Sequence, residues 1–204
     1  MNKILIVFLF LTTILVACDN KKQNIEKQKV SHKTETTATV INQKKEIYFP
    51  AIEKYLINQF GEQYNKGKFS ITFQIFIGLD ERNKEGILVW GYFGLYNYNI
   101  VGDTFETVSG GNHPGLMHIK QTGNDFEVTT FDAVEDGADN MSSAMKIFGD
   151  KYDKYLSINN SEQKREKARA EFLASYIKNR GITVTKYKDF DGTEKNIPVD
   201  ETLN

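Results

Sequence analysis

A single cysteine limits the ways in which this chain of 204 residues can be stabilised. Because Cys18 is the only cysteine, no disulfide can form within the chain and no cluster of cysteines can bind zinc. A folded domain must therefore be held together by its own hydrophobic core. The composition supplies one, since 40% of the residues are hydrophobic and 14 Phe and 10 Tyr are present. Length and composition together indicate one globular domain, or one domain with a tail.

An apolar leader precedes this cysteine. Lys3 is followed by a run over residues 4–14 that only Thr12 and Thr13 interrupt, and Leu15-Val16-Ala17 completes it. This order is typical of a secretory signal peptide. A transmembrane anchor is the alternative, but the run has about 14 residues where a bilayer span needs ~20.

The ending Leu15-Val16-Ala17-Cys18 resembles the lipobox of bacterial lipoproteins. The resemblance implies a signal peptide over residues 1–17, cleavage before Cys18, and acyl chains, palmitate among them, on the cysteine. Two acyl chains or more give stable anchoring. We therefore expect the protein at the cell membrane or the outer membrane, lipid-anchored, with its domain facing the periplasm or the exterior. Ordinary secretion with a chance cysteine is the alternative.

The charges fall into two regions. Residues 19–45 contain seven lysines and three acids, whereas residues 46–204 contain 18 bases and 24 acids. The polar composition of residues 18–43 predicts a flexible tether, and its lysines favour a surface of anionic lipid. The acidic remainder argues against nucleic acid as a partner, because phosphate contacts need a basic surface. We expect the membrane as a partner through the lipid on Cys18, together with an envelope protein or a small ligand.

The pattern beyond the tether predicts one α+β domain over residues 44–190 and a polar tail over 191–204. Alternating and apolar runs predict strands over residues 69–79, 87–99, 104–109, 115–120, 126–131 and 182–187. Helical spacing predicts helices over about 47–60, 141–148 and 162–180, capped by Asp139 and by Asn160 or Ser161 and ended by Gly181. The expected architecture is an antiparallel sheet of about five strands packed by an N-terminal helix and C-terminal helices.

The most distinctive segment is Ser109-Gly110-Gly111-Asn112-His113-Pro114-Gly115. We interpret it as a tight connection between two strands, in which the glycines serve the geometry. Two alternatives stay open: its backbone N–H groups bind an anion, or Ser109 and His113 act as nucleophile and base. No third catalytic group is evident, so no catalytic residue is assigned. The candidate binding residues in this segment are Ser109, Gly110, Gly111, Asn112 and His113.

One face of the strand predicted over 87–99 is lined by large side chains: Leu88, Trp90, Tyr92, Tyr96 and Tyr98. The opposite face is apolar as well, so we expect both faces to be covered. Such a stripe is usually core beneath a helix. The alternative is a platform on which a sugar or a peptide stacks, and Tyr92 and Tyr96 are its candidate binding residues.

Two groups of residues have some of the features of a metal site. His113 and His118 are five positions apart, so in one continuous strand they point to opposite faces. Residues 121–145 contain six acids and no base, but a calcium-loop alignment from Asp132 fails at Val134 and Ser143. No metal and no cofactor is therefore predicted.

A set of short motifs extends over residues 85–180: the Trp/Tyr-rich strand, Ser109-Gly110-Gly111 with Pro114-Gly115, Glu135-Asp136-Gly137, and residues 147–152. In this order they resemble a family of uncharacterised extracytoplasmic bacterial domains. These occur as small lipoproteins or secreted proteins, and a similar module is appended to some sensor-type membrane metallopeptidases. The resemblance implies a sensing or binding module and supplies no catalytic residues.

The leading hypothesis is a membrane-anchored envelope lipoprotein with a small non-catalytic binding or interaction domain. The motif search leaves two alternatives. One is a cell-envelope hydrolase acting on peptide or cell-wall substrates. The other is an inhibitor or immunity-type lipoprotein that occupies the cleft of an enzyme.

Overall fold

The computed structural model describes residues 46–83 and 86–198. The predicted signal peptide, Cys18 and the predicted tether lie outside the described residues, as do residues 199–204 of the predicted tail. The chain divides at Glu46, and the fold below is that of the unit that begins at Ile47.

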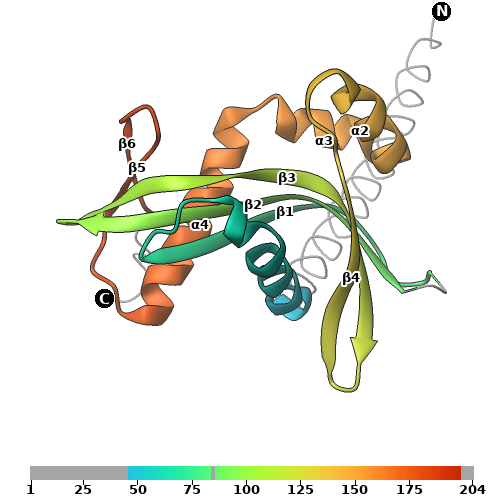
Figure 1. Cartoon of the computed structure of the whole chain (residues 1–204), viewed down its shortest axis with the longest axis horizontal. Coiled ribbons are helices and arrows are strands. Elements are labelled where there is room, and N and C mark those ends of the chain that lie inside the picture. Colours follow the sequence, from blue (N-terminus) through green and yellow to red (C-terminus); the bar gives the residue numbers. More distant parts are fainter. Residues whose placement is uncertain (1–45, 84–85, 199–204) are drawn as a thin grey trace, which may run out of the picture. The chain divides into compact units, whose positions relative to one another are not determined.

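A mostly antiparallel sheet lies at the centre of this unit (Figure 1). Within the described residues it has six strands: β1 (Phe69–Asp80), β2 (Ile87–Val101), β3 (Thr104–Thr122), β4 (Asp125–Ala133), β5 (Lys186–Lys188) and β6 (Glu194–Asn196). Their order is β1-β2-β3-β5-β6, and β4 pairs with the second half of β3. β5 runs parallel to β3, whereas the other pairs are antiparallel.

Helices cover both faces of the sheet (Figure 1). Residues 46–60 are helical, and they are followed by η1 (Gly61–Gln63), η2 (Gly137–Asp139), α2 (Asn140–Phe148), η3 (Gly149–Lys151), α3 (Tyr152–Asn159) and α4 (Glu162–Arg180). The predicted α+β class, with an N-terminal helix and C-terminal helices on a sheet, is thereby confirmed. None of the described helices is long and apolar enough to cross a membrane.

Strand alternation sends neighbouring side chains into two separate cores. Tyr96 and Tyr98 of β2 pack with Leu173 of α4 on one face. Phe93 of β2 packs with Leu56 of helix 46–60 on the other. All five are 8% exposed or less, so the expectation that both faces of this strand are covered is confirmed.

β3 is one continuous strand of 19 residues, not two strands joined by a turn. β2 pairs with it from one end to the other, from Val101 opposite Thr104 to Ile87 opposite Ile119. The predicted connection over residues 109–115 is therefore wrong.

The glycines of this segment serve close packing within the strand. A Cβ atom on Gly110 would come within 3 Å of the backbone of Leu95, on the paired strand. A Cβ atom on Gly115 would come equally close to the carbonyl oxygen of Asp132, on β4. Glycine therefore marks a close approach of backbones here, which is its other common role besides turns.

The predictions for the helix ends are confirmed for α4 and wrong for α2. The Ser161 side chain accepts a hydrogen bond from the N–H of Lys164, and Gly181 ends α4 in the left-handed region with φ 62°. Both predictions are confirmed. Asp139 does precede α2, but its side chain makes no capping hydrogen bond, so that predicted cap is wrong.

The chain after α4 also differs from the prediction. Of the strand expected over 182–187, only the end is strand, and it continues to Lys188. The polar residues Glu194–Asn196 pair with it as β6. Ile197, which follows, is 3% exposed. This hairpin therefore belongs to the folded unit, although residues 191–204 were predicted as a tail.

Candidate functional site

The candidate residues of β3 and β2 do not gather in one place. Directly paired residues share a face, and the register pairs Ser109 with Asn97 and His113 with Phe93, on the side of helix 46–60. It pairs Gly110 with Tyr96, on the side of α4. The predicted site residues thus divide into two sets on opposite faces: Ser109, Gly111 and His113 on one, and Gly110, Asn112, Tyr92 and Tyr96 on the other.

His113 is held between aromatic rings just after helix 46–60. Its ring stacks on Phe60 with 3.8 Å between the centroids, and its Nε2 atom lies 3.1 Å from the Tyr64 hydroxyl. Burial lowers the pKa of His113 to about 4, although the charge of Asp136 acts in the opposite direction. The imidazole is therefore neutral near pH 7.

Ser109 has partners of its own. Its hydroxyl donates to the carbonyl oxygen of Asn65 and accepts from Nδ2 of Asn97, at 3.1 Å. Residues four apart in a strand are separated by ~13 Å, so His113 lies beyond hydrogen-bond reach. The geometry gives no support to Ser109 and His113 as nucleophile and base.

The aromatic stripe of β2 is covered by α4. Tyr92 and Tyr96 are 5% and 8% exposed, and the guanidinium of Arg169 lies 4.0 Å from the Tyr96 ring centroid. The Tyr96 hydroxyl donates to Oδ1 of Asn112 at 3.1 Å. Burial raises the pKa of Tyr96 to about 12. The interpretation of the stripe as core is confirmed, and these rings form no open stacking platform.

The two histidines point to opposite faces of β3, as their spacing predicted, because His118 is paired with Leu88 and His113 with Phe93. His118 Nε2 lies 3.0 Å from Oδ2 of Asp132. Over residues 46–83 and 86–198, no three His, Cys, Asp or Glu side chains come close enough together to hold a metal ion.

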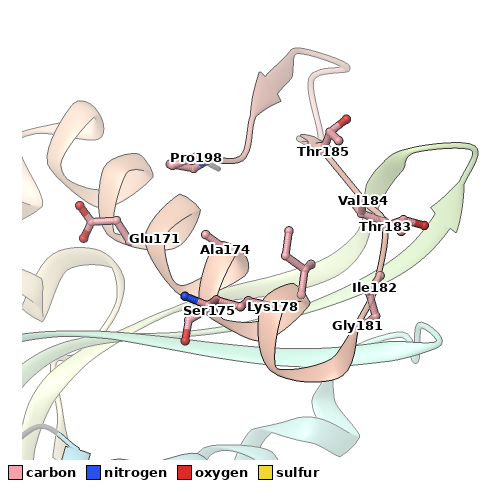
Figure 2. A pocket seen from close by; sticks show the side chains of 11 residues that line it. Glu171, Ala174, Ser175, Lys178, Gly181, Ile182, Thr183, Val184, Thr185 and Pro198 are labelled. Atoms are coloured by element: carbon pink, nitrogen blue, oxygen red, sulfur yellow. The ribbon is translucent and has the colours of Figure 1, made fainter. Parts of the chain in front are cut away.

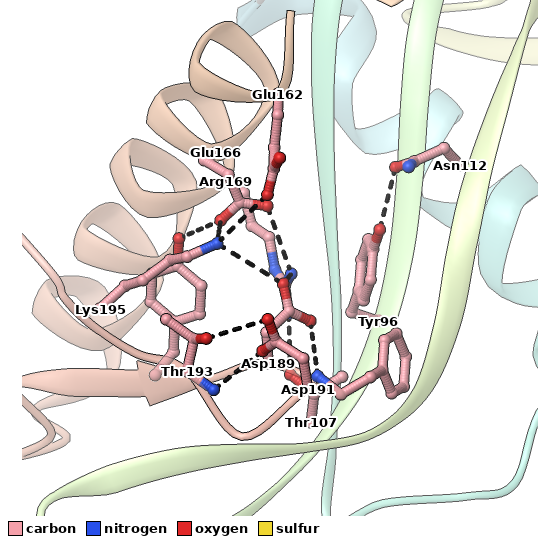
Figure 3. Close-up of polar contacts among 12 residues, drawn as sticks. Tyr96, Thr107, Asn112, Glu162, Glu166, Arg169, Asp189, Asp191, Thr193 and Lys195 are labelled. Atoms are coloured by element: carbon pink, nitrogen blue, oxygen red, sulfur yellow. Dashed lines mark hydrogen bonds and ion pairs between the residues drawn. The ribbon is translucent and has the colours of Figure 1, made fainter.

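A buried charged network, centred on Arg169 of α4, joins three parts of the fold (Figure 3). Arg169 is 3% exposed. Its Nε donates to the Tyr98 hydroxyl at 2.7 Å, Nη2 to Thr107 Oγ1 at 2.8 Å, and Nη1 to Asp189 Oδ2 at 3.1 Å. α4 is thus bonded to β2, to β3 and to the turn after β5.

A second cation completes this network. Lys195 of β6 lies 2.9 Å from Glu166 of α4 and 3.8 Å from Asp189. The Tyr187 hydroxyl donates to the same Glu166 carboxylate. Glu162 also lies 4.0 Å from Lys195. Two cations therefore face three carboxylates, and every charge has a partner, which is the condition under which buried charge is tolerated. The arrangement holds the β5–β6 hairpin against α4.

This network was not predicted from the sequence. Arg169 lies four positions before Leu173, on the helical stripe that faces the core. A base on a core-facing stripe is a signal for a buried ion pair, because an unpaired charge there is too costly. Its hydrogen-bond partners lie 20 to 71 residues away along the chain, where no local pattern names them. Only its ion pair with Glu166, three positions earlier on the same helix, could be named from a local pattern.

A hollow of about 780 Å³ lies between α4 and residues 181–185 (Figure 2). Its apolar lining comes from Ala174, Ile177, Ile182, Val184 and Pro198, and Glu171, Ser175 and Lys178 add polar groups. The volume lies in the range of small-molecule sites, and so does the mixture of apolar surface with a few polar groups. It is assembled from α4 and the chain that follows it.

No protein-family model matches this chain, and comparison with curated proteins and with solved structures yields no match.

Proposed function

We propose that this protein is an envelope lipoprotein: it is exported, lipidated at Cys18 and held at a membrane, and its domain binds a ligand or partner without catalysing a reaction. The observation that carries the proposal is the position of Cys18. The only cysteine of the chain directly follows an apolar leader and the lipobox-like Leu15-Val16-Ala17.

Two features of the folded unit favour binding over hydrolysis. Ser109 and His113, which would carry an acyl-transfer reaction, are held by separate partners on one strand. The charges of the Arg169 network are paired with one another, so they stabilise the domain and are not directed at a substrate. A folded domain on a lipid anchor is suited to presenting a binding surface.

Lipidation is tested by growing cells that express the protein with an alkyne analogue of palmitate. We expect wild-type protein to carry the label, since the lipid is joined to the cysteine sulfur. Cys18→Ser should carry none, and Asp19→Ala, altered at the next residue, should be labelled like wild type. Unlabelled wild-type protein would contradict the proposal.

A further inference from the structure

The two edges of β3 are occupied differently. One edge pairs with β2 over almost its whole length. On the other edge, β5 covers Thr104–Glu106 and β4 covers Gly115–Thr122. Among the residues that the structure describes, no strand pairs with this edge between 107 and 114. Figure 1 shows β3 with the β5–β6 hairpin near its start and β4 beside its end.

Contacts at both ends shorten the part of the β3 edge that has no partner strand. After β5, Asp189 binds Arg169, which also binds Thr107. After β4, the N–H of Val134 donates to the carbonyl oxygen of Pro114 at 2.9 Å. The open edge therefore consists of residues 108–113, a length of roughly 20 Å in an extended strand.

The backbone of this edge presents hydrogen-bonding groups outward. In a strand, the N–H and C=O of one residue point to the same side, and successive residues alternate. The Pro114 carbonyl points away from β2, so the N–H and C=O of Asn112 do so too. Asn112 is exposed. Unpaired groups of this kind can pair with an added strand.

The edge of β1 shows how this sheet covers an edge elsewhere. The rings of Phe49, on helix 46–60, and Phe172, on α4, lie 5.4 Å apart. These helices pack on opposite faces of the sheet, so their contact passes around the outer edge of β1. No described contact of this kind crosses residues 108–113 of β3.

The surroundings of the open edge define the chemistry of a partner. Near one end, Phe190 is 60% exposed, with its ring 6.3 Å from that of Tyr96. At the other end lies the acidic chain after β4, where Asp136 is close enough to His113 to affect its pKa. Among the described residues, no ion pair joins Glu135, Asp136 or Asp139 to a base. Tyr96 lies on the α4 face of the sheet and His113 on the other face. The side chains of an added strand would therefore point alternately to the face of Phe190 and to the face of the acids.

We propose that residues 108–113 of β3 accept an extended basic segment of a partner protein as an additional strand, with apolar side chains alternating with Lys or Arg. The inference rests on the proposed function in one respect, because it names the class of partner that the proposed binding domain would bind. It does not depend on lipidation, so a failure of either test leaves the other intact.

The probe is a fluorescent seven-residue peptide of alternating lysine and valine, titrated against the full chain in detergent and followed by fluorescence anisotropy. We expect saturable binding that weakens as salt is added, since the charges on both sides are exposed. Two control peptides separate the contributions. One carries glutamate in place of lysine, and the other keeps its side chains but has its inner backbone nitrogens methylated, which removes the N–H donors.

The matched protein variants are Asn112→Pro and Asn112→Ala. Both remove the side chain that accepts from Tyr96, but only proline removes the outward N–H. We expect Asn112→Pro to bind the lysine peptide about tenfold more weakly than Asn112→Ala, which corresponds to about 1.4 kcal/mol and lies within the range for one lost hydrogen bond. Asp136→Asn should weaken binding and reduce its dependence on salt.

Circular dichroism establishes that each variant is folded, and the methylated peptide tests the same hydrogen bonds without any change to the protein. Loss of binding with the methylated and glutamate peptides supports the proposal. Equal binding of the methylated peptide, or no binding of the lysine peptide at 1 mM, overturns it.

Discussion

The two faces of the central sheet bury polar groups in opposite ways. On the α4 face, Arg169 is charged and 3% exposed, and each of its nitrogens has a partner. On the face of helix 46–60, Thr72 and Gln74 of β1 are neutral and 2% and 3% exposed. Their side chains have no hydrogen-bond partner within the described residues.

What a buried polar group contributes to stability therefore depends on whether it has hydrogen-bond partners. Removing a member of a complete network leaves the remaining groups buried without partners, which is expensive. Removing a group that has no partner takes away only its own desolvation penalty. The same kind of substitution should therefore have opposite effects on the two faces.

Among the substitutions proposed below, Arg169→Met should have the largest effect on the free energy of unfolding. The variant keeps much of the side-chain volume but leaves Tyr98 and Thr107 without their donor, and within the described residues Asp189 keeps one cation, Lys195 at 3.8 Å. We expect the free energy of unfolding to fall by about 3 kcal/mol, measured by urea denaturation. Lys167→Met, at an exposed position of the same helix, should change it by less than ~0.5 kcal/mol. Similar changes in the free energy of unfolding for both variants would contradict the expected role of the network.

Gln74→Met should change the free energy of unfolding in the opposite direction. Methionine fits a similar space without an amide group, so the free energy of unfolding should rise by about 1.5 kcal/mol. Thr72→Val should act in the same direction with a smaller change. Gln63→Met is the control, because that side chain is bonded to Gln59 at an exposed site. A loss of stability in Gln74→Met would mean that this amide is satisfied in solution.

A smaller effect, on the same face as Gln74, comes from His113. Its folded-state pKa of about 4 lies below the ordinary value of 6.5, so the unfolded chain binds the proton more readily. The stability that the neutral ring contributes is complete above pH 6.5 and is lost as the pH falls towards 4. Between pH 7 and 5 these two pKa values correspond to a loss of at most about 2 kcal/mol, and solvent screening of this half-buried ring reduces the loss that we expect to about 1 kcal/mol. His113→Gln should flatten that decline, and His118→Gln should leave it unchanged.

The smallest effect concerns the cap of α4. Ser161→Ala removes the hydrogen bond from Lys164 and should lower stability by about 0.5 kcal/mol. Asn159→Ala, just before the cap, is the matched control. A loss as large as that of Arg169→Met would show that α4 depends on its own start more than on its network.

Local patterns predicted the elements of this fold better than their connections. The strands β1 and β2 lie within two residues of the predicted ranges, because alternation is a property of the segment itself. The turn at residues 109–115 was wrong because Gly and Pro are also used where backbones approach closely. β6 was missed because Glu194–Asn196 are polar and pair only with the short β5.

The candidate site was harder to predict because its contacts are distant along the chain. His113 stacks on Phe60 and Ser109 bonds to Asn65, more than 40 residues earlier. The division of the site between two faces follows from strand alternation, but only once residues 104–122 are known to be one strand. The prediction that His113 and His118 point to opposite faces succeeded, because it needed only the assumption that both lie in one continuous strand.

The central claim, lipid anchoring at Cys18, is tested most directly by the mass of the protein extracted from membranes of the organism that makes it. We expect a mature chain that starts at Cys18 and carries a diacylglyceryl group on the sulfur. A chain that starts at any other residue, or an unmodified Cys18, would contradict it.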